Sequence, residues 1–271
     1  MLKKILLSCL ILVSNSTFSK SLALSFDDGL DLSTHPQAQH INDAILNTLK
    51  QNNVHAIIYP SLSKIGANDG LGMIKQWGEQ GHRIGNHGNL HLNLNKDEVN
   101  LSTYLADMQQ GHQAFSTLEG FVPRYRFPFL KEGNTLEKRD GVRQWIKDYH
   151  YQSGAVSIDA SDWFYNQLFL KYQQENDQQS LVKLKQAYIF HLLDRAKYYD
   201  DLAQQTLGRS PKHVLLLHVR AINAAWLQDI IDAFHHQGWT FIDSDTAYQD
   251  PLYNIEPKLL PAGESILWTI A

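Results

Sequence analysis

Ser25-Phe26-Asp27-Asp28-Gly29 follows the short apolar run Leu22-Ala23-Leu24 near the start of the chain. Successive side chains of a strand point to opposite faces, so both carboxylates serve one site only if the chain turns there, as Gly29 allows. A metal ion can then hold one carboxylate while the other remains free to accept a proton. A solvated Asp-Asp-Gly turn fits this pentapeptide equally well. The rest of the chain decides between the two interpretations.

A second polar stretch, His87-Gly88-Asn89-Leu90-His91, carries two imidazoles four residues apart. This spacing predicts that both rings lie on one side of a helical turn, within reach of one zinc ion. The chain has 13 histidines, so chance pairs are expected. With Asp28, however, the pair forms a set of two imidazoles and one carboxylate. Such a set leaves a position for water or substrate, as in hydrolytic metal sites.

Three further motifs follow in order, Arg126-Phe127-Pro128-Phe129, Asp159-Ala160-Ser161-Asp162-Trp163 and Leu216-Leu217-His218. With the first two, they make the chain resemble the polysaccharide deacetylases of carbohydrate esterase family 4, the NodB homology group. The first motif of that family, Thr/Ser-Phe-Asp-Asp-Gly, matches residues 25–29, and the second, His-Ser/Thr-x-x-His, matches residues 87–91. Arg-x-Pro-Phe/Tyr matches residues 126–129, and Asp-x-x-Asp-Trp matches residues 159–163. Leu-x-His matches residues 216–218. Each motif is weak alone, but five in order are a strong signal.

The resemblance implies a division of roles. One divalent metal ion, with zinc the expected one, is bound by Asp28, His87 and His91. Asp27 acts as the base that takes a proton from water, and His218 acts as the acid that protonates the leaving amine.

Other residues support these roles in the resemblance. Arg126 tethers Asp27, and Asp162 pairs with His218 to hold its charged form. The backbone N–H of Phe129 joins the metal in stabilising the oxyanion. Trp163 and Leu216 line a pocket for the acetyl methyl group, although plain core packing explains Leu216 nearly as well.

Two departures from the family pattern affect the expected shape of the cleft. Gly88 stands where the family usually has a hydroxyl residue, and Leu130 stands where it commonly has glycine. Asp159 is expected to be structural, bonding loop N–H groups at a strand end.

Short apolar runs alternate with amphipathic stretches, which predicts parallel strands joined by crossover helices. Strands are expected at residues 21–26, 54–59, 83–85, 125–129, 154–158, 214–219 and 240–242. Helices are expected at residues 41–51, 72–80, 99–118, 135–149 and 224–236. The motif residues fall at the C-terminal ends of strands, where (β/α) barrels build their active sites. We therefore expect an α/β fold, a distorted (β/α) barrel of about seven parallel strands.

The stretch from Tyr165 to Arg209 is longer than one crossover needs. Its polar first part, residues 171–179, is expected to be a loop between helices. Its second part spaces Leu181, Leu184, Tyr188, Leu192, Ala196 and Tyr199 at three and four, as one stripe of a long helix. Most such stripes pack on the core, but the stretch follows Trp163 and can also shape one side of the cleft.

Composition and the N-terminus set the expected class of protein. The chain has 271 residues, 43% of them hydrophobic and 19% charged, which suits one large domain. Its net charge of −4 gives no basic footprint for nucleic acid. Residues 1–19 read as a secretory signal, with Lys3 and Lys4 before an apolar run too short to span a bilayer. The single cysteine, Cys9, lies in that signal, where a lipoprotein acylation box is the weaker alternative because few apolar residues precede it.

These observations predict a catalytic domain over residues 20–271, exported to the periplasm or outside the cell, and monomeric. The expected function is metal-dependent removal of acetyl groups, foremost N-acetyl, from a polysaccharide or oligosaccharide. One alternative is a related deformylase or amidase of the same superfamily. Another is a carbohydrate-binding protein without catalysis, which would need neither Asp27 nor His218. The sequence does not name the polymer: peptidoglycan, chitin oligomers, poly-N-acetylglucosamine and O-acetylated xylan all present similar groups.

Overall fold

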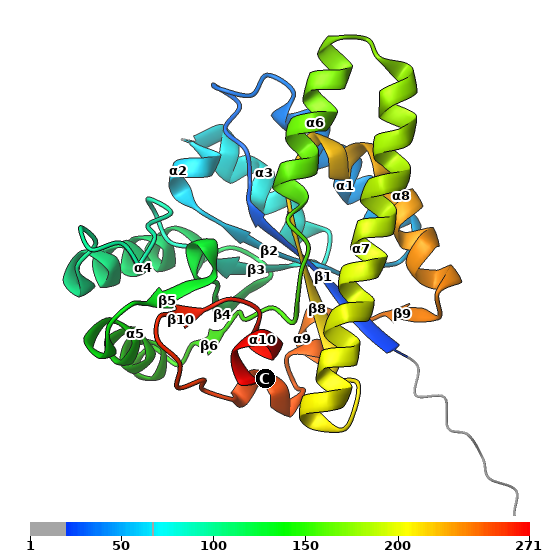
Figure 1. Ribbon diagram of the computed structural model, residues 1–271. Helices are drawn as coiled ribbons and strands as arrows, with labels where there is room; N and C mark the ends of the chain where they lie inside the picture. Colours follow the sequence, from blue (N-terminus) through cyan, green and yellow to red (C-terminus); the bar gives the residue numbers. More distant parts are fainter. Residues whose placement is uncertain (1–19, 67) are drawn as a thin grey trace, which may run out of the picture.

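A curled sheet of parallel strands forms the centre of the molecule in the computed structural model, which describes residues 20–66 and 68–271 (Figure 1). The sheet order is β6-β4-β3-β2-β1-β8-β7, with β9 paired to β1 beside β2. The strands are β1 (Lys20–Asp28), β2 (Ile57–Pro60), β3 (Arg83–Asn86), β4 (Phe121–Tyr125), β6 (Gln152–Ser153), β7 (Ile158–Asp159), β8 (Lys212–His218) and β9 (Trp239–Phe241). The prediction of a distorted parallel barrel is confirmed.

The register of the central strands brings the predicted motifs to one edge of the sheet. Asp27 pairs with Tyr59 on β2 and with His218 on β8, so the ends of these three strands lie level. The interior of β1 is apolar and fully buried from Leu22 to Leu24, as a strand covered on both faces requires. Residues far apart in the sequence therefore meet at the C-terminal ends of the strands.

The strands expected at residues 125–129 and 154–158 are wrong. β4 ends at Tyr125, and Phe129 and Leu130 both have a φ of 57°, which no strand accommodates. Residues 154–157 instead cross the gap between β6 and β7. Gly154 N–H donates to Tyr125 O at 2.6 Å, and Ser157 N–H donates to Val214 O at 3.2 Å. Because it bonds to both sides, this segment links the two edges of the curled sheet.

Helices cover the outside of the sheet, and several of them begin at a side-chain cap. They are α1 (Ala38–Gln51), α2 (Leu62–Ile65), α3 (Asn68–Glu79), α4 (Leu101–Phe115), α5 (Leu136–Asp148), α6 (Asp162–Gln174), α7 (Gln178–Leu207), α8 (Ala221–His236), α9 (Ser244–Ala247) and α10 (Ile266–Ile270). Asn100 accepts from Thr103 N–H, Thr135 from Lys138 N–H and Asp177 from Ser180 N–H, the side-chain caps of α4, α5 and α7. None of the helices in the described ranges is long and apolar enough to cross a membrane.

Helices α6 and α7 stand side by side at the edge of the sheet near β7 and β8 (Figure 1). The α7 stripe packs on the core as predicted, with Leu184, Tyr188, Leu192, Ala196 and Tyr199 buried. The loop expected at residues 171–179 is shorter, because α6 continues to Gln174 and α7 begins at Gln178. Glutamine and lysine are good helix formers, so a polar run of this kind supports an exposed helix end as well as a loop.

The C-terminal segment returns across the β4 side of the sheet. It contains η2 (Pro251–Asn254) and β10 (Ala262–Gly263), which pairs antiparallel with β5 (Lys131–Gly133). β5 directly follows η1 (Pro128–Leu130), the turn that carries the third motif. The pairing of β10 with β5 therefore stabilises the strand that follows the third-motif turn.

Candidate active site

The end of β1 turns at the second carboxylate. Asp28 has a φ of 78°, and Gly29 follows with a φ of 83°. A left-handed backbone at a residue other than glycine costs about 1–3 kcal/mol and is typical of functional sites. The turn explains how adjacent carboxylates face one cavity, because Asp27 and Asp28 both line the same cleft.

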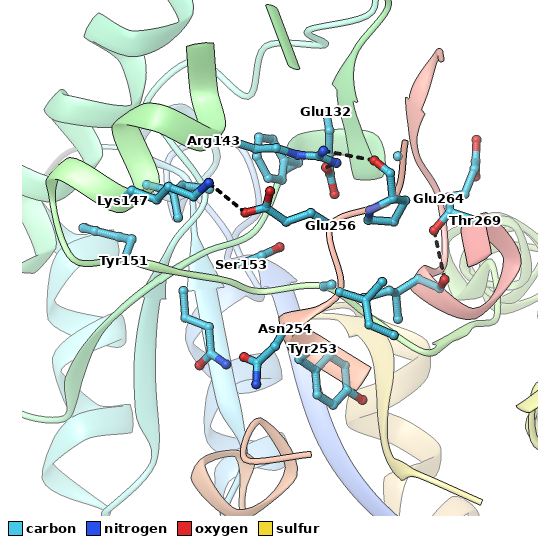
Figure 2. Close-up of a pocket in the computed structure, with 18 residues that line it drawn as sticks. Glu132, Arg143, Lys147, Tyr151, Ser153, Tyr253, Asn254, Glu256, Glu264 and Thr269 are labelled. Atoms are coloured by element: carbon cyan, nitrogen blue, oxygen red, sulfur yellow. Dashed lines mark hydrogen bonds and ion pairs between the residues drawn. The ribbon is translucent and has the colours of Figure 1, made fainter. Parts of the chain in front are cut away.

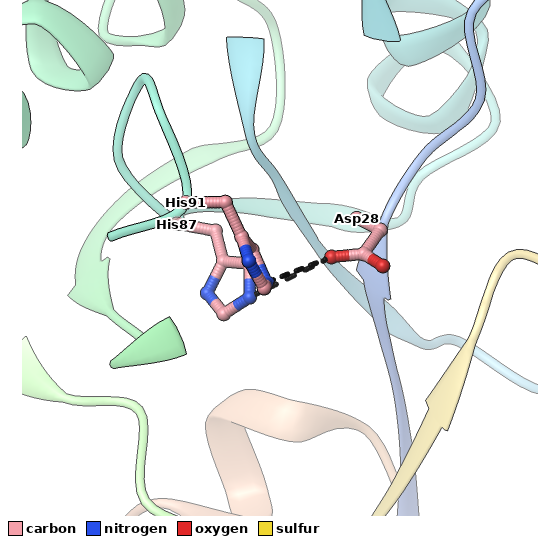
Figure 3. Close-up of side chains that lie close together, drawn as sticks. All are labelled: Asp28, His87 and His91. Carbon is pink, nitrogen blue, oxygen red and sulfur yellow. Dashed lines mark ion pairs between the residues drawn. The ribbon is translucent and has the colours of Figure 1, made fainter. Parts of the chain in front are cut away.

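The two histidines of the second motif lie on a loop and not on a helical turn, so the expected helical geometry is wrong. His87 directly follows β3, and His91 adopts a φ of 55°. The rings nevertheless meet edge to face, with their centroids 4.9 Å apart. Figure 3 shows both imidazoles directed at Asp28, with His87 Nε2 at 3.9 Å and His91 Nε2 at 3.2 Å from Asp28 Oδ1.

Gly88, the departure in the second motif, is required by a carboxylate from α4. Its φ is 78°, and a Cβ at this position would lie 2.3 Å from Asp107 Oδ2. Asp107 accepts hydrogen bonds from the N–H groups of Asn89 (3.0 Å) and Leu90 (2.6 Å). This carboxylate therefore holds the loop that carries His91. Sequence reasoning missed Asp107, although an acid on the buried face of a helix was an available signal.

The donor set of Asp28, His87 and His91 fits a divalent metal ion. Their ligand atoms all lie within 4.8 Å of one another. Asp28 Oδ1 is buried and has no hydrogen-bond donor within the described part of the chain. His87 Nδ1 lies 2.7 Å from Arg126 O, so this nitrogen donates and Nε2 keeps its lone pair toward Asp28. Burial holds the pKa of His87 well below its usual value, which favours the neutral imidazole that a metal needs.

Asp28 remains ionised despite its burial. Burial acts to raise its pKa, but the approach of His91 Nε2 to 3.2 Å and the nearby charge of His218 outweigh it and lower the pKa. Its second oxygen, Oδ2, accepts a hydrogen bond from Arg220 Nη2 at 3.2 Å. The carboxylate thus points one oxygen at the imidazoles while the other is fixed by a guanidinium.

Asp27 is held by a buried arginine. Arg126 Nη1 donates to Asp27 Oδ1 at 3.0 Å, and its Nη2 donates to Ser25 Oγ at 3.1 Å and to the Tyr248 hydroxyl at 3.2 Å. The guanidinium also lies over the ring of Tyr59, 4.3 Å from its centroid. Burial raises the pKa of Asp27 to about 6, against the opposing attraction of Arg126. Such a carboxylate is ionised at neutral pH yet basic enough to accept a proton.

His218, at the end of β8, is paired with a fully buried carboxylate. Asp162 Oδ1 lies 2.6 Å from His218 Nδ1, and its Oδ2 accepts from His218 N–H at 2.8 Å and from Asn223 Nδ2 at 2.7 Å. Burial acts to lower the pKa of His218, but the charge and hydrogen bond of Asp162 raise it to about 9. His218 is therefore protonated at neutral pH, with Nε2 left as the nitrogen available to the cleft.

A cleft of about 580 Å³ collects most of the predicted residues. It is lined by Asp27, Asp28, His87, His91, Phe129, Trp163, Leu216 and His218, whereas Arg126 and Asp162 lie behind their partners. Phe129 and Trp163 are about half exposed at the rim, at 56% and 48%. Asp159 also lines the cleft, and its Oδ1 accepts from Ser161 N–H at 3.3 Å, which agrees with the expected loop contact.

Helix α6 forms one wall of this cleft through residues that sequence reasoning did not single out. Asn166, Gln167 and Leu170 line it together with Trp163. The idea that the segment after Trp163 shapes the cleft is confirmed for α6, while α7 packs on the core. Lys64 and Arg220 also line the cleft and were missed. Arg220 lies two residues after the fifth-motif histidine, a proximity that was the available signal.

A second cavity of about 220 Å³ lies between α5 and the C-terminal segment (Figure 2). Four of its five charged residues pair within the wall, Arg143 with Glu132 at 3.0 Å and Lys147 with Glu256 at 3.1 Å, and the fifth, Glu264, pairs with Lys131. It contains none of the residues predicted for catalysis or metal binding. The residues predicted for catalysis and metal binding therefore gather around the cleft at the strand ends.

The sequence profile of the polysaccharide deacetylase family matches residues 14–151, half of the chain. The chain therefore belongs to this family. A peptidoglycan-N-acetylglucosamine deacetylase from Bacillus cereus is 32% identical over 143 residues, 52% of this chain and 46% of that relative. The chain spans less than half the length of the curated relatives it matches.

Two solved structures share the fold at low sequence identity. A peptidoglycan N-acetylglucosamine deacetylase superposes with a TM-score of 0.60 at 22% identity, covering 84% of this chain and 88% of the other. A CE4 family pseudoenzyme from Bacillus anthracis superposes with a TM-score of 0.58 at 13% identity, covering 85% of this chain and 66% of the other. Since one is described as an enzyme and the other as a pseudoenzyme, function has to be argued from the residues of the site.

Proposed function

We propose that this member of the polysaccharide deacetylase family is a metal-dependent hydrolase that removes acetyl groups, foremost N-acetyl groups, from a sugar polymer or oligomer. The observation that carries the proposal is the buried Asp28 Oδ1, which faces two imidazole nitrogens and has no other partner among the described residues. A base and an acid, Asp27 and His218, line the same cleft with pKa values on opposite sides of neutrality.

In the first step of the proposed reaction, the attack of water on the acetyl carbonyl, Asp27 acts as the base. Asp28, His87 and His91 would hold one divalent ion, with zinc the expected one for two imidazoles and a carboxylate. Such an ion would polarise the acetyl carbonyl and lower the pKa of the attacking water. Asp27 takes the proton from the attacking water, and Arg126 keeps Asp27 aimed at it. Because Arg126 is itself fixed by Ser25 and Tyr248, the base has little freedom to turn away.

In the second step, the departure of the amine, His218 acts as the acid. Collapse of the tetrahedral intermediate releases an amine, which needs a proton to leave. His218 donates that proton from Nε2, since its Nδ1–H is held by Asp162. The N–H of Phe129 serves as a donor to the oxyanion, and Trp163 and Leu216 line the space for the acetyl methyl group.

Two alternatives use the same residues differently. A deformylase or amidase would keep the entire set, so only substrate tests separate it from a deacetylase. A carbohydrate-binding protein without catalysis has a precedent for this fold in the pseudoenzyme neighbour. Against it stands the pairing of a buried base with a raised pKa and a protonated acid, which binding alone does not need.

The central experiment compares metal content with turnover. Purified protein should contain about one zinc equivalent, and His91→Ala should contain much less. Asp27→Asn should retain the metal and lose acetate release by about 10²–10⁴-fold, because an amide cannot take a proton. The substrates are chitin oligomers, poly-N-acetylglucosamine, peptidoglycan and acetylated xylan. Full turnover by Asp27→Asn, or equal metal in His91→Ala and wild type, would contradict the proposal.

The place of action is also proposed. Residues 1–19, which lie outside the described residues, are expected to be removed on export, so that a monomer acts in the periplasm or outside the cell. Intact mass of the protein recovered from the producing cell tests this. A mass that includes Met1, or a lipid on Cys9, would contradict it, and light scattering measures the oligomeric state.

A further inference from the structure

The charges that serve the proposed chemistry are matched within the protein. Asp27 is neutralised by Arg126, and protonated His218 is neutralised by Asp162. Asp28 offsets half of the charge of the divalent ion that it would hold. The remaining charges on the cleft wall come from Asp159, Lys64 and Arg220. Because Lys64 and Arg220 outnumber Asp159, this part of the wall has a net positive charge. An uncharged glycan carries no anion that could pair with it.

The backbone of Lys64 is held close to the loops that carry the expected metal ligands. It lies on α2, whose start is bonded to both loops that carry the expected ligands. Ser61 N–H donates to Asp28 O at 3.1 Å, and Ser63 N–H donates to Asn89 O at 2.7 Å. The Lys64 side chain is half-buried, and within the described ranges it makes no hydrogen bond or ion pair. An ammonium on the cleft wall without a counter-charge is available to a ligand.

Arg220, at the start of α8, reaches the expected metal ligand Asp28 from another side of the cleft. Only its Nη2 has a partner in the described chain, Asp28 Oδ2 at 3.2 Å, and its Nε is buried without one. The side chain is 30% exposed, so the rest of the guanidinium reaches the cleft. A guanidinium carries five N–H donors in a planar fork that matches a carboxylate. Arg220 therefore has donor capacity that the protein does not fill.

We propose that Lys64 and Arg220 select a substrate that carries a carboxylate close to its acetylated nitrogen. The inference rests on the proposed deacetylase function and narrows its substrate class to acidic N-acetylated glycans. The carboxylate has two chemical sources: an acidic ether on the acetylated sugar itself, as in muramic acid, or a neighbouring uronic acid. In both cases the acetamido group lies at the expected metal ligands, while the carboxylate contacts the Lys64 ammonium and the Arg220 guanidinium.

The test measures how strongly a carboxylate on the substrate promotes acetate release. Three oligosaccharides of equal length are compared by kcat/KM: neutral chitin oligomers, peptide-free oligomers alternating N-acetylglucosamine and N-acetylmuramic acid, and oligomers alternating N-acetylglucosamine and glucuronic acid. Wild type should prefer one acidic series over the neutral one, which identifies the source. Lys64→Met and Arg220→Gln should each lower that preference about 5- to 50-fold, the effect of a charge-assisted hydrogen bond.

Lys50→Met on the exposed end of α1 is the matched control and should keep the wild-type preference. No preference in wild type, or the same preference in Lys64→Met as in Lys50→Met, would overturn the inference. If Arg220→Gln loses zinc but keeps the preference, Arg220 only supports Asp28, and its share in the inference is wrong.

A binding measurement separates this inference from the proposed function. Calorimetry on zinc-loaded Asp27→Asn measures the dissociation constants of the same three oligosaccharides without turnover. The acidic series should bind more tightly than the neutral one, and the difference should shrink with added salt and with Lys64→Met. If no substrate releases acetate but this difference is found, the hydrolase proposal fails and the carboxylate site stands. Equal binding of all three series overturns the carboxylate site.

Discussion

Strand β8 carries a histidine at each end, and each histidine is paired with a buried aspartate. At the start of the strand, His213 Nε2 lies 3.3 Å from Asp200 Oδ1. At its end, His218 Nδ1 lies 2.6 Å from Asp162 Oδ1. The two pairs nevertheless differ in charge. Burial lowers the pKa of His213 despite its carboxylate partner, whereas Asp162 raises the pKa of His218 to about 9.

The aspartates explain the difference. Asp200 also binds Lys20 at 2.9 Å and the Ser210 hydroxyl at 2.5 Å, so its charge is already met by a permanent cation. Asp162 meets His218 as its cation, and its other contacts are neutral N–H groups. In this chain, the histidine with the raised pKa is the one whose aspartate meets no other cation. The same kind of pair serves architecture at one end of β8 and suits proton transfer at the other.

His213 also contacts a serine, which gives this end of the strand the composition of a nucleophilic triad. Ser157 Oγ lies 3.0 Å from His213 Nδ1. However, Ser157 is fully buried, and its Oγ accepts a hydrogen bond from Val214 N–H at 2.9 Å. Because no substrate reaches this hydroxyl, we interpret the three residues as a structural network that fixes β8.

The largest expected effect separates the two histidines by turnover. His218→Gln should lower kcat by about 10²–10⁴-fold, because glutamine cannot protonate the leaving amine. His213→Gln should change kcat less than about threefold in protein that remains folded, since general acid-base steps involve only groups that reach the substrate. Acetate release at saturating substrate measures both. A similar loss in both variants would remove the functional distinction between the two ends of β8.

The second prediction concerns pH. Wild-type activity should rise as Asp27 deprotonates near pH 6 and fall as His218 deprotonates near pH 9. The acid and alkaline limbs of this pH profile report the two coupled groups together. Asp162→Asn removes the charge that raises the pKa of His218, so the alkaline limb should move to lower pH, toward the ordinary histidine value of about 6.5. Profiles of kcat/KM measure the shift. An alkaline limb that does not move would show that Asp162 does not set the charge of His218.

The third prediction concerns stability. Asp200→Asn loses the ion pair with Lys20 and weakens the contacts to Ser210 and His213, so it should destabilise the fold by about 1–3 kcal/mol at pH 7. The pKa of Asp200 is lowered in the fold, so its contribution is present above the unfolded value and is lost as pH falls through the folded value. Urea unfolding at pH 7 and in acid measures this. A difference from wild type that grows in acid would contradict it.

The smallest expected effect belongs to Ser157. Ser157→Ala should lower stability by about 1 kcal/mol, because it removes hydrogen bonds to Val214 and His213 without adding bulk. Acetate release should be unchanged, and wild type should not react with serine-directed phosphonates. Labelling of Ser157 by such a reagent would show that the hydroxyl is accessible and would contradict its structural role.

Much of the candidate site was predictable because its residues belong to short motifs at strand ends. Asp27 and Asp28 follow an apolar run on β1, and His218 ends the apolar run of β8, so parallel pairing alone brings them to one edge. Local geometry was less predictable. The four-residue spacing of His87 and His91 suggested a helical turn, but Gly88 and the Asp107 carboxylate make it a loop.

The sequence by itself determined the parallel α/β fold, the order of the motifs and the residue types at the strand ends, since hydrophobic periodicity and motif spacing are local properties. Beyond the pair of His218 and Asp162, which the motifs implied, only the tertiary structure decided which groups are charged and which are free. Burial lowers the pKa of His213 although the Asp200 carboxylate lies 3.3 Å from it. Lys64 and Arg220 meet at one cleft although 156 positions separate them. Burial and Coulomb interactions depend on distance in space, and distance along the chain does not report it.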